Sequence, residues 1–344
     1  AGLVASTLKM SDSDFHAGRM KFTDGAGAGN IANQGSITTS GGGPVYLVAP
    51  NIQNSGVIRN DGGEIILAAG KSVDIVNPGA PDLRVTVTAP DNQAVNLGQL
   101  IAGRIGMYGG LIRQAGVVNA NTAVRGENGK IVFKATKDVT LEKGSVTTAN
   151  GPTGGSITVQ SETGKATIAG TVEANGTQGK GGTIAVIAPQ GVSVETTGRL
   201  TANGSEGGSV SLASSAGAVA VSGTVTANST AGQAGAIALN AATTATVAAT
   251  GQLSASGVVI EAGSRVAAAG ANGGTVSLQS DQAGVTVQGT VDATASEGLG
   301  GSVHIAALSD ITLDTGSQIL VGGLSGGEAK IESTEGTLWW MYPA

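Results

Sequence analysis

The chain has no cysteine and contains few aromatic or charged residues. The missing cysteine excludes disulfides, thiolate metal sites and cysteine nucleophiles in all 344 residues. Aromatic residues make up only 2 %, so a wide core filled by large rings is excluded. The net charge is −6, and Lys and Arg are scattered singly rather than gathered in a basic stripe, so we expect no nucleic-acid partner. No apolar run approaches the length of a membrane-spanning helix.

Glycine and small apolar residues take the place of these missing types. Glycine numbers 58, and the 40 % of hydrophobic residues are mostly Ala, Val and Ile. Low charge and many β-branched residues argue against a disordered chain. Collagen is excluded, because glycine does not recur at every third position. We therefore expect a narrow core filled by small side chains.

A short element, most often Gly-Gly followed by alternating apolar residues, recurs along the chain. Its copies are NGKIVF at 128, GGSITV at 154, GGTIAV at 181, GGSVSL at 207, AGAIAL at 234, GGTVSL at 273, GGSVHI at 300 and GGEAKI at 326. The steps are 26 or 27 residues, except for one of 39. We interpret the extra segment of that step, SGVVIEAGSRVAAAG, as a coil without its opening strand. A sustained period of this length predicts a solenoid.

Each period holds three short alternating runs, such as GSITVQS, KATIAG and TVEANG within residues 155–176. Alternation predicts that Ile157 and Val159 point inward while Thr158 and Gln160 point outward. Three strands and three turns per period predict an all-β fold, a right-handed parallel β-helix of roughly a dozen three-strand coils. At about 4.8 Å per coil, the rod would be on the order of 60 Å long.

The N-terminal third departs from this regular period. Residues 33–70 repeat at about 20 residues with the pattern N-x-G-x-I, and 76–93 carries three of the eight prolines and breaks the period. We predict that 76–93 forms a hairpin projecting outside the helix. The chain is accordingly divided into a first region, 1–135, a regular repeat region, 136–336, and an aromatic C-terminal segment, 337–344.

The C-terminal segment LWWMYPA holds both tryptophans and one of the three tyrosines. Such a cluster is expected either to cap the open edge of the last coil or to contact another chain. The candidate cap or inter-subunit contact residues are Trp339, Trp340 and Tyr342.

Asparagines at equivalent places in successive coils predict a ladder of turns. Asn150, Asn175, Asn203 and Asn228 lie in AN-G or AN-S turns, where Asn tolerates the left-handed conformation and can hydrogen-bond along a stack. Asn175, Asn203 and Asn228 also begin N-x-S/T sequons and are candidate glycosylation sites. We favour the structural role, because the turn accounts for the asparagine without a sugar.

The first part of the chain resembles a known family of secreted proteins. The resemblance rests on GLVAS-L at 2–8, S-x-x-D-F-x-A-G at 11–18 and the paired N-x-G-x-I coils with their G-G-x-V-x-L strands. These segments resemble the secretion domain of two-partner-secretion exoproteins of the filamentous haemagglutinin type, over roughly residues 1–135. Beyond that region only the generic β-helix repeat is shared.

The resemblance implies a right-handed β-helix that passes unfolded through a dedicated outer-membrane pore of a Gram-negative bacterium. Such proteins are secreted or held at the cell surface, and adhesion is their commonest role. The family's region before GLVAS, with its cap and N-P-N-G motif, has no counterpart here, so we expect a fragment or a processed form.

Residues that support catalysis or metal binding are sparse. The only histidines, His16 and His304, lie near opposite ends of the sequence, which excludes a histidine metal cluster or a shared triad. Acidic residues of the repeat region occur mostly once per coil. The nearest carboxylate pairs are Asp12 with Asp14 and Asp310 with Asp314. We expect no catalytic, cofactor or metal site, and the chain is predicted not to be an enzyme.

The sequence therefore predicts a secreted or cell-surface β-helical stalk that acts in adhesion. Its expected partners are the secretion pore and a glycan or protein of a host or neighbouring cell. The alternative is a structural subunit that assembles with itself, end to end, into an extracellular fibre. A third possibility is a β-helix that binds or cleaves polysaccharide.

Overall fold

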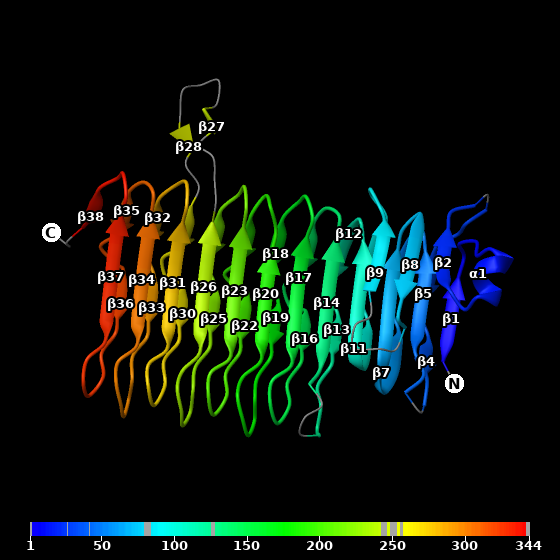
Figure 1. Cartoon of the computed structure of the whole chain (residues 1–344), viewed down its shortest axis with the longest axis horizontal. Coiled ribbons are helices and arrows are strands. Elements are labelled where there is room, and N and C mark those ends of the chain that lie inside the picture. The colour runs from blue at the N-terminus through cyan, green and yellow to red at the C-terminus, as the bar shows by residue number, and fades with distance from the viewer. Residues whose placement is uncertain are drawn as a thin grey trace.

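The computed structural model describes residues 2–25, 27–40, 42–78, 84–124, 128–241, 246–247, 253–254 and 257–341. The chain winds into a right-handed parallel β-helix, which confirms the predicted fold class (Figure 1). Each coil gives one strand to each of three faces, and equivalent strands of successive coils pair in parallel. The second face alone is a sheet of 12 strands, in agreement with about a dozen coils.

The first and third faces form one sheet, because two long strands bend from the third face into the first. These strands are β7 (Val57–Ala69) and β11 (Gln99–Gly109). The other strands of the first face are β1 (Leu3–Ser6), β5 (Val45–Ala49), β14 (Lys130–Ala135), β17 (Ser156–Ser161), β20 (Thr183–Ile187), β23 (Ser209–Ser214), β26 (Ala236–Ala241), β31 (Thr275–Ser280), β34 (Ser302–Ala307) and β37 (Glu328–Ser333).

The second and third faces are built mainly from strands of three residues. The second face contains β3 (Ile31–Asn33), β6 (Ile52–Asn54), β10 (Gln93–Asn96), β12 (Leu111–Gln114), β15 (Val139–Leu141), β18 (Ala166–Ile168), β21 (Val192–Val194), β24 (Val219–Val221), β29 (Val258–Ile260), β32 (Val285–Val287), β35 (Ile311–Leu313) and β38 (Leu338–Trp340). The third contains β4 (Ser36–Thr38), β13 (Val117–Asn119), β16 (Val146–Thr148), β19 (Thr171–Glu173), β22 (Arg199–Thr201), β25 (Thr224–Thr226), β30 (Arg265–Ala267), β33 (Thr290–Asp292) and β36 (Gln318–Leu320).

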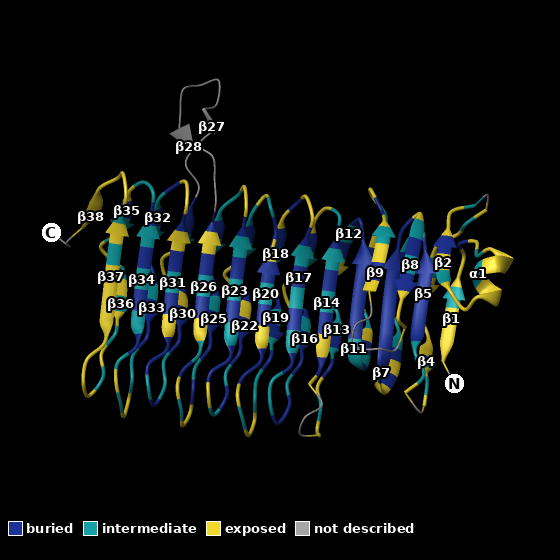
Figure 2. Ribbon diagram, viewed as in Figure 1, coloured by how far each residue is buried: buried dark blue, intermediate teal, exposed yellow. Residues whose placement is uncertain are grey.

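The core is a single narrow column along the axis of the helix. Ile157 and Val159 are fully buried, while Thr158 and Gln160 face outward, which confirms the predicted alternation. The column runs without interruption from Val45 to Leu313, and buried residues alternate with partly buried or exposed ones along most strands (Figure 2). This column continues across residue 135, where the sequence analysis divides the chain. The proposed division is therefore based on the change in coil length and on the additional sheet described below, and not on a separate core.

Glycine opens each repeat because neighbouring coils approach too closely there for a side chain. A Cβ placed on Gly182 would clash with the carbonyl oxygen of Gly155 in the previous coil, and one on Gly208 would clash with that of Gly182. Only glycine leaves room for this backbone contact. The stack continues with the same contact at Gly235 and Gly274.

The 39-residue step contains one complete coil with an insertion, so its interpretation as an additional incomplete coil is wrong. β29 and β30 are the second and third strands of the coil that β26 opens, since they pair with β24 and β25 of the previous coil. The insertion lies at 242–256, where the structure describes two short antiparallel strands, β27 (Thr246–Val247) and β28 (Leu253–Ser254). Periodicity alone does not distinguish an insertion within a coil from a partial coil.

A small antiparallel sheet lies on the outer surface of the first face near the N-terminus. It consists of β2 (Met20–Thr23), β8 (Ser72–Val76) and β9 (Arg84–Thr88), in the order β2-β8-β9. The hairpin is outside the helix, as predicted, but it begins at Ser72 rather than at 76 and does not project. Its apolar side chains, including Val73 and Val85, are buried against Tyr46 and Ile66 of the coils. Apolar residues on both surfaces make packing more favourable than projection.

Candidate functional site

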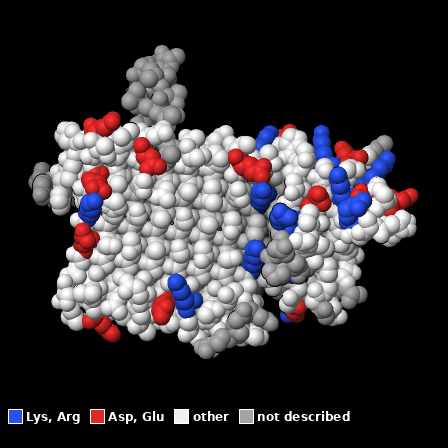
Figure 3. Space-filling view, viewed as in Figure 1, with Lys and Arg blue, Asp and Glu red and all other residues white. Residues whose placement is uncertain are grey.

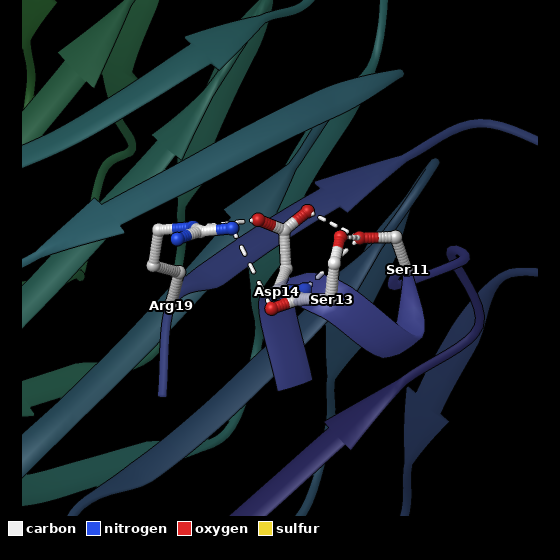
Figure 4. Close-up of polar contacts among 4 residues, drawn as sticks. All are labelled: Ser11, Ser13, Asp14 and Arg19. Atoms are coloured by element: carbon white, nitrogen blue, oxygen red, sulfur yellow. Dashed lines mark hydrogen bonds and ion pairs between the residues drawn. The ribbon is translucent and has the colours of Figure 1, made fainter. Parts of the chain in front are cut away.

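The motif at 11–18 forms a single-turn helix, α1 (Asp12–His16), at the N-terminal end of the rod (Figure 1). Ser11 is its N-cap and accepts a hydrogen bond from the backbone N–H of Asp14 at 3.1 Å. The Ser11 hydroxyl in turn donates to the Asp14 carboxylate at 2.6 Å, and Arg19 Nε donates to the same carboxylate at 2.7 Å (Figure 4). These contacts hold one turn of helix that is too short to be stable alone.

The charge and backbone of this turn explain further residues of the motif. The Ser11 hydroxyl and then the Arg19 guanidinium hold the pKa of the Asp14 carboxyl below its usual value. Gly18, just after the helix, has a φ of 67°, in the left-handed region that favours glycine. The Ser, Asp and Gly of the motif are therefore required by local folding.

Phe15 is the motif residue for which the core gives no reason. Its side chain is 71 % exposed, and α1 has no buried residue. It makes an edge-on ring contact with His16, with 5.9 Å between the ring centroids. The two other phenylalanines of the chain, Phe22 and Phe133, are both buried. Its exposure leaves the ring of Phe15 available for a contact with another molecule.

The predicted asparagine ladder is present in the turns between the third and first faces. The left-handed backbone expected of these asparagines is wrong, because Asn77 is the one non-glycine residue with a positive φ in the described part of the chain. The side-chain Oδ1 of each asparagine accepts the backbone N–H of its counterpart in the next coil: Asn150 from Asn175 at 2.7 Å, Asn175 from Asn203 at 2.9 Å, and Asn203 from Asn228 at 2.8 Å. The side chains are half-buried. Glycosylation at Asn175, Asn203 and Asn228 stays a prediction.

A second amide ladder, which the sequence analysis does not predict, runs through the N-terminal coils and is fully buried from Asn54 to Gln114. Asn33 donates to Asn54 at 2.7 Å, Asn54 to Asn96 at 2.8 Å, and Asn96 to Gln114 at 2.7 Å. Each amide of the ladder also donates to the carbonyl of the glycine two positions on, which agrees with the N-x-G pattern. The ladder stops where Leu141 takes the position equivalent to Gln114.

The aromatic C-terminal segment lies on the last strand of the second face. Trp339 and Trp340 of β38 are 53 % and 60 % exposed and pair in register with Thr312 and Leu313. Tyr342 lies outside the described residues. The assignment of this segment as a cap or as a contact with another chain stays a prediction.

The sparse ionisable groups serve structural contacts in the described part of the chain. His304 faces outward and lies 2.7 Å from the Glu332 carboxylate, while Asp310 and Asp314 accept hydrogen bonds from backbone N–H groups. Lys330 and then His304 lower the pKa of Glu332. Among the described residues, no three His, Asp or Glu side chains come together as a metal site. α1, with 5 residues, is the longest described helix and cannot reach across a bilayer.

One solved structure is similar over nearly the whole chain, the HMW1 secretion domain from Haemophilus influenzae. The match covers 98 % of this chain and 74 % of that chain, with 24 % sequence identity and a TM-score of 0.56. No family model and no curated protein matches the sequence. The likeness establishes the β-helical fold that the repeat predicts.

Proposed function

We propose that the chain is the exported β-helical part of a two-partner-secretion exoprotein of a Gram-negative bacterium, and that it acts outside the cell as a non-catalytic adhesin stalk. The resemblance over residues 1–135 and the fold shared with a secretion domain support this proposal. The absence of cysteine suits a chain that crosses the periplasm and the pore unfolded.

The exposure of Phe15 carries the proposal. The folding of α1 accounts for Ser11, Asp14 and Gly18 of the motif, but it gives no role to a phenylalanine that is 71 % exposed. A contact made during export gives this phenylalanine a role. We infer that Phe15 binds the periplasmic part of the outer-membrane pore.

Secretion tests this inference directly. The chain is placed behind a signal peptide and coexpressed with the two-partner pore of its own bacterium, and the culture medium is assayed. Phe15→Ala is expected to reduce secretion at least tenfold while leaving the thermal stability of the purified protein unchanged. Leu299→Ala, at a residue that is 64 % exposed far along the chain, is the matched control and should be secreted normally. Normal secretion of Phe15→Ala would overturn the inference.

The surface of the repeat region fits a stalk that binds by shape and hydrogen bonding. Its central coils show few charged side chains on the face in Figure 3. Ser and Thr occupy many outward positions, among them Thr158, Ser193 and Thr286. A glycan or protein of a host or neighbouring cell is the proposed partner.

The second candidate is a fibre subunit, supported by the more than half-exposed Trp339 and Trp340. Electron microscopy of the purified chain, with its mass measured in solution, separates the two functions. Single rods of monomer mass support the stalk. Filaments with a regular axial repeat would support the fibre and overturn the stalk.

A further inference from the structure

A cavity of about 290 Å³ opens where the small antiparallel sheet meets the coils. The free edge of β9 forms one wall, and outward-facing residues of β7, β11 and β14 form the base and the opposite wall. Its size is near the lower end of the range for small-molecule sites, roughly 300–1,000 Å³, so it suits a ligand of one ring.

The base of the cavity exists because one outward position holds glycine. Ile66, Gly106 and Val132 lie in register on successive strands of the first face, and the missing side chain at Gly106 makes room for the ring of Tyr108 between two branched side chains. A Cβ at Gly106 would meet the ring of Tyr108, which therefore lies over the glycine. Burial and then the charge of Glu64 raise the pKa of Tyr108, so its phenol stays protonated. The base is thus apolar, with a hydroxyl donor.

The cavity is lined by four basic side chains and one carboxylate. The basic residues are Arg84, Arg104, Lys130 and Lys134. The carboxylate belongs to Glu64, which is buried and is bound by the Tyr46 hydroxyl at 2.5 Å and by Arg104 at 3.3 Å. Lys134 pairs with Glu162 at 3.0 Å, outside the lining.

This concentration of positive charge is unusual for the molecule. The whole chain has a net charge of −6, yet Lys and Arg side chains gather toward the N-terminal third on the face in Figure 3, with Asp and Glu side chains among them. Of the four basic side chains in the lining, Arg104 and Lys134 pair with Glu64 and Glu162, which leaves the charges of Arg84 and Lys130 for a ligand. Lys130 and Arg84 are exposed, so their charges reach into solvent at the mouth of the cavity. An anion is therefore attracted to this place and to few others on this face.

We propose that this cavity binds a sugar residue that carries a carboxylate. The basic side chains at the mouth suit the carboxylate, and the apolar base with Tyr108 suits the C–H face of the ring. A simple inorganic anion would use only the basic side chains and would make no use of the apolar base. The proposal adds a ligand to the proposed stalk, but it concerns the purified chain and does not depend on export.

Titration of the purified chain with D-glucuronate, followed by NMR, tests the proposal. For a single ring we expect a dissociation constant on the order of 1 mM. Glucose, which lacks the carboxylate, should bind at least tenfold more weakly, as should sodium sulfate. Raising the salt concentration should weaken glucuronate binding, because the basic side chains at the mouth are exposed.

Charge-removing variants locate the site. Lys130→Gln and Arg84→Gln should each weaken glucuronate binding about fivefold, the usual effect of one exposed charge-assisted contact. Lys165→Gln removes the same charge from an exposed position outside the cavity and should bind as the unmodified chain does. Gly106→Val would displace the Tyr108 ring from the base and should abolish binding; its fold is checked by circular dichroism.

Three results would overturn the proposal. Glucuronate could fail to bind at 20 mM, sulfate could bind as tightly as glucuronate, or Lys130→Gln and Arg84→Gln could both leave glucuronate binding unchanged. A chain that fails to be secreted by a two-partner pore but binds glucuronate would refute the proposed export route while leaving this site in place.

Discussion

Replacement of Asn96 by leucine removes an interior rung of the buried amide ladder. Asn96 is fully buried, accepts from Asn54 and donates to Gln114. Leucine is a suitable replacement, because Leu141 occupies the equivalent corner one coil beyond the end of the ladder. The variant therefore changes the hydrogen bonding of the corner more than its packing.

The expected cost follows from the groups left without partners. The two hydrogen bonds to neighbouring amide side chains are lost, at about 1 kcal/mol each, together with longer ones to the carbonyls of Gly98 and Val117. The buried Gln114 carbonyl also loses the donor that satisfies it, at about 1–3 kcal/mol. Burial of the leucine offsets about 1–2 kcal/mol of this. Asn96→Leu should therefore lower the free energy of unfolding of these coils by about 2 kcal/mol.

The double variant Asn96→Leu/Gln114→Leu should be more stable than Asn96→Leu alone. Removing both partners leaves no carbonyl without a donor at Gln114, and Asn54 Nδ2 keeps its contacts with the carbonyls of Gly56 and Gln99. A double variant that is more stable than the single variant is the result that tests the ladder most directly.

Hydrogen exchange of peptides from each coil is the appropriate assay, because a solenoid opens locally and a single unfolding midpoint averages over many coils. Peptides covering β10 and β12 should lose protection in Asn96→Leu and regain part of it in the double variant. Peptides from β31 onward serve as the internal control. A double variant less protected than the single one would refute the reasoning.

Three further predictions concern the glycine stack, the capped helix α1 and the asparagine ladder. Gly208→Ala should destabilise the chain by about 1–3 kcal/mol in urea unfolding, because its Cβ clashes with a carbonyl of the previous coil, whereas Gly322→Ala, with open space around it, should change stability by less than about 0.5 kcal/mol. In Ser11→Ala the pKa of Asp14, measured by NMR titration, should rise toward its usual value, because the Ser11 hydroxyl no longer donates to the carboxylate. In the unmodified chain the ionised Asp14 stabilises the capped turn at a pH above the usual pKa of an aspartate, and this stabilisation is lost as the pH falls through the lowered pKa. Asn203→Ala should cost about 1 kcal/mol in urea unfolding, and Asn203→Asp should cost less, because a carboxylate oxygen can accept the same amide of the next coil.

The fold was predictable because its determinants are local and repeated. Alternation within each strand assigns Ile157 inward and Thr158 outward, and the period of 26 or 27 residues sets the register between coils. The asparagine ladder was predictable for the same reason, since Asn175 and Asn203 occupy equivalent places. A pattern that recurs in every coil is supported by many observations in one sequence.

The packing of the hairpin was not predictable from alternation. The run around 84–88 shows which residues share a face, but it does not show what that face contacts. The answer depends on outward apolar residues of other coils, Tyr46 and Ile66, which an alternating pattern assigns to solvent. Apolar residues at outward positions of consecutive coils indicate that another element covers them, and the sequence does contain this pattern.

The same contrast explains where a specific site can form. In the repeat region each coil presents nearly the surface of the one before it, so any small ligand would find many equivalent places and none that is unique. A unique site needs a break in the repeat. The N-terminal third supplies such breaks in the long strands β7 and β11, the covering sheet, and Gly106 in an outward row between Ile66 and Val132. For this chain, recognition of one defined ligand is therefore expected where the repeat is interrupted, while the regular coils provide length and stiffness.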